Sequence, residues 1–364
     1  MKRIIWLLAA MAIAGLGLVA TGAAGTSAKQ ATSVVIGAEQ EPPCLNTYLE
    51  GCNNTWASYI ALTALRGSHQ LQPDGTWKTD LVDSATVTQN PFALTYKIKK
   101  EAVWNDGTPV SADDFIFTWL TLINPKNEVA SRAGFELIQR AKKIDAKTVK
   151  FIFKKPYTDW KNIFDPVLPK HALSGEDFNK VWVDGIVANP KNGKPISDGA
   201  YQVTNFTKGQ SATIEKNPKW WGTPKPKIDK IIWRFITNTD SEIAAIRGGE
   251  VDMIYPQPQL QLAGLKGQSG LTFSSTKGAV FEHLEINTTA KGFALARAPW
   301  FRRALAYSID RDQLVKTLYG TINPTLTPLQ SMVYVPTQKA EYKPNWERYK
   351  FDPAKAAAQM HGYR

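Results

Sequence analysis

The sequence predicts a mixed α/β protein of more than one domain, in which the first domain is left and later re-entered. Strand-like runs such as residues 147–156 interleave with helix-like runs such as residues 111–123. A chain of 364 residues also exceeds what one ordinary core holds and indicates two or three domains. The stretch 189–203 is rich in Asn, Pro and Gly and is typical of a crossing between domains.

The individual elements follow from local periodicity and turn chemistry. We expect strands over residues 33–38, 93–100, 149–153, 201–206, 212–216, 230–236, 250–255 and 279–287. We expect helices over residues 56–65, 111–123, 135–143, 239–248 and 299–320.

Residues 103–119 show how local chemistry defines one such unit. The run Asn105-Asp106-Gly107 favours a tight turn, and Ser111 is placed to cap the following helix. Asp113 and Asp114 would then meet the positive end of the helix dipole. We interpret this unit as scaffold.

The N-terminus has the pattern of a secretion signal. Lys2 and Arg3 precede an apolar run over residues 4–20, and small residues lead to a cleavage point near Ala28. We therefore expect an exported protein in the periplasm or at the outer face of the cytoplasmic membrane. The apolar run is about as long as a short membrane span, so an uncleaved anchor stays open as an alternative.

Composition excludes several classes of function. The formal net charge is +12, but the basic residues are scattered, so we expect no nucleic-acid partner. Phosphate-loop, zinc-protease and serine-hydrolase motifs are absent, and the four histidines are widely spaced. We therefore expect no catalytic residues, no metal site and no cofactor.

Two cysteines, Cys44 and Cys52, lie close together in the sequence. In an oxidising compartment such a pair predicts a disulfide. Metal binding is the alternative, but two thiols without a nearby histidine make a poor zinc site.

Five motifs in register carry a resemblance to a known family. They are Trp104-Asn-Asp-Gly-Thr-Pro-Val-Ser-Ala-Asp-Asp-Phe115; Asp198-Gly-Ala-Tyr201 with Glu215-Lys-Asn-Pro-Lys-Trp-Trp221; Lys227-Ile-Asp-Lys-Ile231 with Arg247-Gly-Gly-Glu-Val-Asp-Met253; Glu285-Ile-Asn287 with Trp300-Phe-Arg-Arg-Ala-Leu-Ala-Tyr-Ser-Ile-Asp-Arg311; and Tyr349-Lys-Phe-Asp-Pro-Ala-Lys355. Each is weak alone. Together they make the mature chain resemble the family 5 extracytoplasmic solute-binding proteins of ABC importers, the oligopeptide-, dipeptide- and nickel-binding group.

The resemblance implies a type II periplasmic-binding-protein fold, a two-lobed clamp with an extra domain. After a signal over residues 1–28, domain I would comprise residues 29–55 and 196–287. Domain II would be inserted as residues 56–195. Residues 288–364 would begin domain III, which continues much further in family members, so we expect an incomplete third domain and an apolar side of the 299–320 helix left partly uncovered.

The resemblance also implies a function without chemistry. A short peptide would be held by strand-like hydrogen bonds and delivered to membrane permease subunits driven by an ATPase. The protein would be a monomer. Two alternatives stay open: a sensor or structural protein of the envelope on the same fold, or a binder of a non-peptide solute such as a nickel chelate.

Candidate ligand contacts follow from matching positions. Glu50, Gly51, Cys52 and Asn53 lie where family members place a loop against the peptide, although Glu50 could equally be an exposed loop acid. Phe281 and His283 lie where relatives place aromatic pocket walls. Tyr255 and Gln257 lead from a strand end toward the expected cleft, and an ordinary surface loop is the alternative there.

Overall fold

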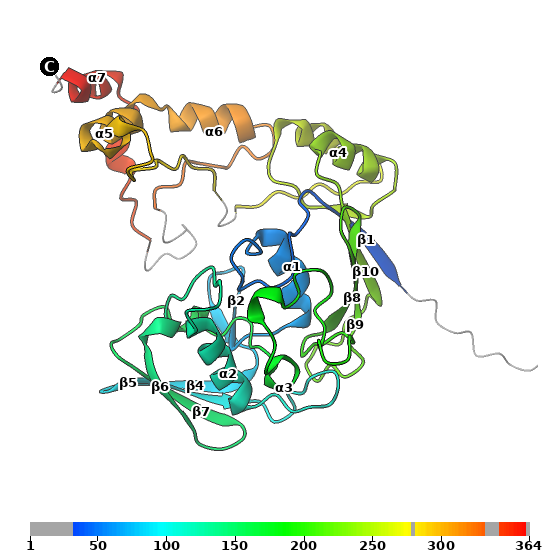
Figure 1. Cartoon of the computed structure of the whole chain (residues 1–364). Coiled ribbons are helices and arrows are strands. Elements are labelled where there is room, and N and C mark those ends of the chain that lie inside the picture. Colours follow the sequence, from blue (N-terminus) through cyan, green and yellow to red (C-terminus); the bar gives the residue numbers. More distant parts are fainter. Residues whose placement is uncertain (1–31, 278–280, 332–341, 362–364) are drawn as a thin grey trace, which may run out of the picture. The chain divides into compact units, whose positions relative to one another are not determined.

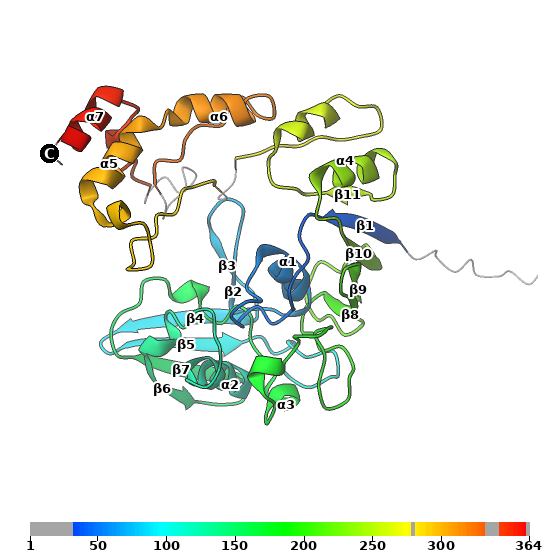
Figure 2. The ribbon, with the colours of Figure 1, turned by 45° about the horizontal axis from the view of Figure 1, so that its top comes forward.

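The first sheet of the computed structural model, which describes residues 32–277, 281–331 and 342–361, joins distant stretches of the chain. Its strand order is β11 (Met253–Ile254), β1 (Ser33–Ala38), β10 (Lys230–Phe235), β9 (Ser211–Lys216) and β8 (Tyr201–Thr207). Figure 1 labels β1, β10, β9 and β8, and Figure 2 also labels β11. Strand β1 pairs in parallel with both β10 and β11, whereas β10, β9 and β8 are antiparallel. The chain therefore returns to the sheet that its first strand begins, as the sequence predicts.

Two helices cover opposite faces of this sheet. Helix α1 (Thr55–Ala64) places Trp56 against Trp233 of β10, with ring centroids 5.7 Å apart. Trp233 pairs with Ile36, so both point to the α1 face. The next residue, Gly37, faces helix α4 (Thr239–Arg247), where a side chain would meet Ile254 and Glu242 at 3.0–3.3 Å. Glycine at this position lets α4 lie close to the strand.

A second sheet is antiparallel throughout and carries the largest core. Its order is β4 (Val82–Gln89), β5 (Phe92–Ile98), β7 (Thr148–Phe153) and β6 (Ile138–Lys143), and a small hairpin of β2 (His69–Leu71) and β3 (Trp77–Thr79) precedes it. Helix α2 (Ala112–Ile123) packs against it (Figure 2). Tyr96, Phe115, Phe151 and Phe164 are fully buried there, and their ring centroids lie 4.8–6.2 Å apart.

The predicted scaffold unit around Trp104 is confirmed as a buried tryptophan, a turn and a capped helix. The Ser111 N–H donates to the Asp114 carboxylate at 2.8 Å, which closes a capping box at the start of α2. The turn also binds the crossing segment. The Asn105 side chain donates to the Pro195 carbonyl at 2.9 Å and accepts the Ser197 N–H at 3.1 Å.

Three local expectations were wrong. Residues 135–143 begin with a short 3-10 turn and continue as strand β6, because pairing with β7 outweighs the helix-like pattern. The described residues 281–287 form no strand. The run 299–320 divides into α5 (Pro299–Ser308) and α6 (Arg311–Tyr319), because the Asp310 side chain accepts the Gln313 N–H and starts a new helix.

The last helices complete the described chain. Helix α5 packs against α7 (Pro353–His361), and the Asp352 N–H donates to the Tyr307 carbonyl at 2.9 Å. The short helix α3 (Lys170–Leu173) lies earlier, beside α2. Leu314 and Leu318 of α6 are 47% and 39% exposed.

The predicted signal, residues 1–28, lies outside the described residues. Within the described ranges, no helix combines the length and the apolar character needed to cross a membrane.

We expect Thr118→Val to destabilise the second sheet and its helix. The buried Thr118 hydroxyl accepts the Leu168 N–H at 2.8 Å and donates to the Asp114 carbonyl. Valine keeps the shape but leaves the amide unpaired, which should lower the free energy of unfolding by about 1–3 kcal/mol. Urea unfolding measures the change. Thr121→Val is the control, because the Thr121 hydroxyl makes no hydrogen bond within the described ranges. An equal loss of unfolding free energy in both variants would contradict a stabilising role for the Thr118–Leu168 hydrogen bond.

Candidate functional site

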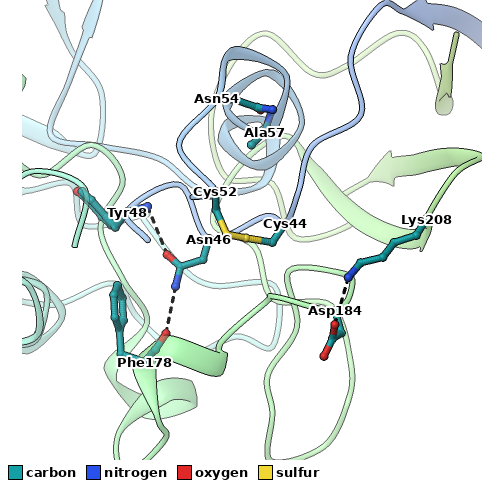
Figure 3. Close-up of a disulfide and its surroundings, with 9 residues drawn as sticks. All are labelled: Cys44, Asn46, Tyr48, Cys52, Asn54, Ala57, Phe178, Asp184 and Lys208. Carbon is teal, nitrogen blue, oxygen red and sulfur yellow. Dashed lines mark hydrogen bonds and ion pairs between the residues drawn. A yellow bond between two sulfur atoms is a disulfide. The ribbon is translucent and has the colours of Figure 1, made fainter. Parts of the chain in front are cut away.

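The loop between β1 and α1 is closed by a disulfide. Cys44 and Cys52 are bonded, with Cα atoms 5.2 Å apart, and both are buried. Figure 3 shows the bond beside Asn46, whose side chain accepts the Tyr48 N–H and donates to the Phe178 carbonyl. Asn54 then caps α1 by accepting the Ala57 N–H at 2.7 Å. The disulfide therefore holds a loop that is fixed at both ends.

The backbone of this loop lies on neighbouring segments. The Glu50 N–H donates to the Glu128 carbonyl at 2.7 Å, and the Leu45 N–H donates to the Trp182 carbonyl at 3.1 Å. The side chains of Glu50 and Asn53 are exposed, and Gly51 has a φ of 83° that only glycine adopts without strain. The loop thus presents Glu50 from a rigid base, while the Cys52 sulfur is occupied by the disulfide.

A second candidate region lies at the carboxyl ends of the parallel strands. Strands β1, β10 and β11 are parallel, so their carboxyl ends meet at one edge of the sheet (Figure 2). Open α/β sheets bind ligands outside such an edge. Glu39 directly follows β1, and Tyr255 directly follows β11. We call Glu39, Tyr59, Tyr255 and Glu242 the strand-end cluster.

The polar contacts of this cluster are specific. The Glu39 carboxylate accepts the Gln257 N–H at 2.8 Å, which ties the chain after β11 to the end of β1. The ring of Tyr59, on α1, meets Tyr255 edge-on with centroids 6.0 Å apart. Burial raises the pKa of the Tyr59 hydroxyl, with smaller contributions from Tyr255 and the charge of Glu39.

Glu242 is the most unusual member of the cluster. It lies on α4, its side chain is fully buried, and neither carboxylate oxygen has a hydrogen-bond partner in the described part of the chain. One of its oxygens lies 3.3 Å from the position of a Cβ on Gly37. Burial, and secondarily the charge of Glu39, raises the pKa of Glu242 from 4.5 to about 7.

The predicted ligand residues fall into three separate groups. Tyr255 and Gln257 are at the strand-end cluster, whereas residues 50–53 are on the disulfide loop. Phe281 and His283 contact each other, with ring centroids 5.3 Å apart, and His283 lies 3.2 Å from the Glu285 carboxylate. Among the described residues, no hydrogen bond, ion pair or ring contact joins one group to another. Their ligand roles stay predictions.

Sequence reasoning missed Glu39, Tyr59 and Glu242. Glu39 could have been identified as a candidate from the sequence, since it directly follows the end of a predicted strand. Tyr59 and Glu242 lie on helices whose approach to the sheet is not visible in the sequence. The described ranges contain no group of three or more His, Cys, Asp or Glu residues arranged to hold a metal ion.

Comparison with known families identifies the chain. The model of the bacterial extracellular solute-binding proteins, family 5, matches residues 76–361. The chain belongs to this family. Family 5 proteins bind solutes for transport and are not enzymes.

Curated relatives cover nearly the whole chain. The glutathione-binding protein GsiB of Salmonella choleraesuis is 26% identical over 344 residues, which is 94% of this chain and 64% of GsiB. GsiB of Shigella boydii is also 26% identical, over 93% of this chain and 64% of its own. The chain therefore spans less than two thirds of the length of these family 5 relatives.

Solved structures agree on the fold. The periplasmic EDTA-binding protein EppA superposes with a TM-score of 0.75 at 24% identity, over 91% of this chain and 64% of EppA. NikZ of Campylobacter jejuni, in complex with Ni(L-His), superposes with a TM-score of 0.73 at 22% identity, over 91% of this chain and 63% of NikZ. The oligopeptide-binding protein AppA of Bacillus subtilis, in complex with a nonapeptide, superposes with a TM-score of 0.70 at 18% identity, over 92% of this chain and 64% of AppA. The predicted type II periplasmic-binding-protein fold is confirmed.

We expect Cys44 and Cys52 to resist alkylation in the native, unreduced protein. The disulfide spans a sequence separation of 8 and should stabilise the fold by roughly 2–3 kcal/mol through chain entropy. Mass spectrometry after iodoacetamide treatment, and unfolding of the Cys44→Ser/Cys52→Ser variant, measure the two effects. Two alkylated thiols without reductant would contradict the pairing.

We expect Glu242 to make stability fall as pH rises. Its folded-state pKa lies above its unfolded value, so the unfolded chain releases the proton near pH 4.5 and the folded chain near pH 7. The free energy of unfolding should therefore fall by about 3 kcal/mol between these two pH values. Urea unfolding between pH 4.5 and 8 should show this loss in the native sequence and in the control Glu136→Gln, but not in Glu242→Gln. The same pH slope in all three would show that Glu242 does not titrate in this range.

Proposed function

We propose that this chain is the solute-binding component of an ABC importer and binds a short peptide or similar small solute outside the cytoplasm. The family 5 match over residues 76–361 carries the proposal. The exposed parallel strand ends support it, because their side chains are polar and aromatic and belong to segments held in place by hydrogen bonds.

The relatives narrow the class of solute without fixing it. GsiB is named for glutathione, AppA was solved with a nonapeptide and NikZ with Ni(L-His). A peptide-like solute is common to the first two, so we place it first for this chain. A nickel chelate stays the second candidate because NikZ superposes as well as AppA.

We further propose the domain division expected from the sequence. Residues 29–55 and 196–287 would form the first domain, residues 56–195 an inserted second domain and residues 288–364 part of a third. The sheet shared by β1, β10 and β11 supports the discontinuous first domain. In the importer the protein would act as a monomer and would deliver its solute to permease subunits with their ATPase.

Native mass spectrometry of the protein purified from its own host tests the binding function. We expect a bound small molecule that leaves on mild denaturation, because clamps of this fold bury their solute. The mass of that molecule identifies its class. A protein that carries no solute, and that binds no member of a peptide and metal-chelate panel in calorimetry, would favour the sensor or structural alternative.

We expect Glu50→Ala to weaken peptide binding. In this proposal the exposed Glu50 carboxylate accepts a peptide N–H, and loss of one charged hydrogen bond costs about 1.5–3 kcal/mol, or roughly ten- to a hundredfold in affinity. Isothermal calorimetry measures the change, with Glu136→Ala as the control because Glu136 is an exposed acid in the 3-10 turn before β6. Equal affinities in both folded variants would remove Glu50 from the site.

A further inference from the structure

The strand-end cluster combines two acids with no basic partner. Glu39 and Glu242 take part in none of the ion pairs between described residues, although the chain carries 44 Lys and Arg against 32 Asp and Glu. Glu39 follows Gly37 by two residues, and the Glu242 carboxylate lies over Gly37. The charge of Glu39 also contributes to the raised pKa values of Glu242 and Tyr59.

Glu242 is the observation that points to a ligand. Its carboxylate is fully buried and both oxygens lack a donor in the described ranges. Leaving such a group unpaired costs free energy, since buried acids are usually hydrogen-bonded or paired. The carboxylate lies over Gly37, two residues before Glu39, and therefore behind the edge where a solute would lie.

The other members complete a cation-binding chemistry. Glu39 is half-buried and uses one oxygen for Gln257, which leaves the second oxygen to accept another donor. Tyr255 is 55% exposed and contacts the Tyr59 ring. Aromatic faces beside a carboxylate attract ammonium and guanidinium groups through the ring quadrupole. Trp56 packs against Tyr59 and fixes the position of that ring.

We propose that the strand-end cluster is a subsite for a positively charged group of the solute, an ammonium or a guanidinium. Glu39 receives the cation, Tyr59 and Tyr255 flank it, and Glu242, in its ionised form, acts as a positioning residue that adds negative potential from behind Gly37. This subsite rests on the proposed solute-binding function and assigns that solute to a cationic class.

Matched probes test the subsite. The tripeptides Ala-Lys-Ala and Ala-norleucine-Ala, each with a free or an acetylated N-terminus, differ in positive groups but little in shape. Calorimetry with the intact protein should show at least tenfold tighter binding of the probes that carry an ammonium over acetyl-Ala-norleucine-Ala. This ratio should fall to within about twofold in Glu39→Gln and by a smaller factor in Glu242→Gln. The control Glu136→Gln should keep the native ratio.

The outcomes separate the two proposals. A ratio near one in the native protein, with all four probes bound, overturns the cation subsite and leaves the solute-binding function in place. If none of the four probes binds, both the cation subsite and the binding of peptides by this chain are overturned. A general loss of affinity in Glu39→Gln with an unchanged ratio shows a structural role and also overturns the subsite, so the ratio, rather than affinity alone, decides.

Discussion

The parallel pairing of β1 with β10 is the constraint on which the described architecture depends. All six residues of β1 pair with β10, and β11 is added on the other side. This pairing aligns three strand ends, places α1 and α4 on opposite faces, and sets the positions of Glu39 and Tyr255. Without it the side chains of the strand-end cluster would have no common location, because they come from four separate segments.

The crossing segment before β8 is held against the end of α1 by hydrogen bonds to one backbone carbonyl. The Ala64 carbonyl accepts the N–H groups of Asp198 and Gly199 and the Ser197 hydroxyl. A Cβ on Gly199 would lie 2.4 Å from the Thr63 carbonyl oxygen. Burial raises the pKa of the Asp198 carboxyl, one oxygen of which accepts the Arg66 N–H. These contacts explain the Asp-Gly motif in the crossing segment as a packing requirement.

Much of the fold could be predicted from the sequence, but less of the candidate site. Alternation and turn chemistry indicated β7 and α2, because these features are local. The helix predicted over residues 135–143 was wrong, since pairing of β6 with β7 decides the structure there. The disulfide loop was visible from cysteine spacing. The strand-end cluster was only partly visible, because the Glu242 carboxylate lies over Gly37 of β1, and sequence spacing carries no record of that approach.

The distant origin of the β1 and β10 strands has a consequence for folding order. During synthesis β1 emerges early and stays without its neighbour until residue 235 is available. The Cys44–Cys52 loop needs only nearby residues, so in an oxidising compartment it can close before β1 pairs with β10. An apolar strand waiting unpaired is a template for association between chains, and contacts of such long sequence separation form slowly. The yield of folded protein should therefore depend on how well β1 is shielded during that interval.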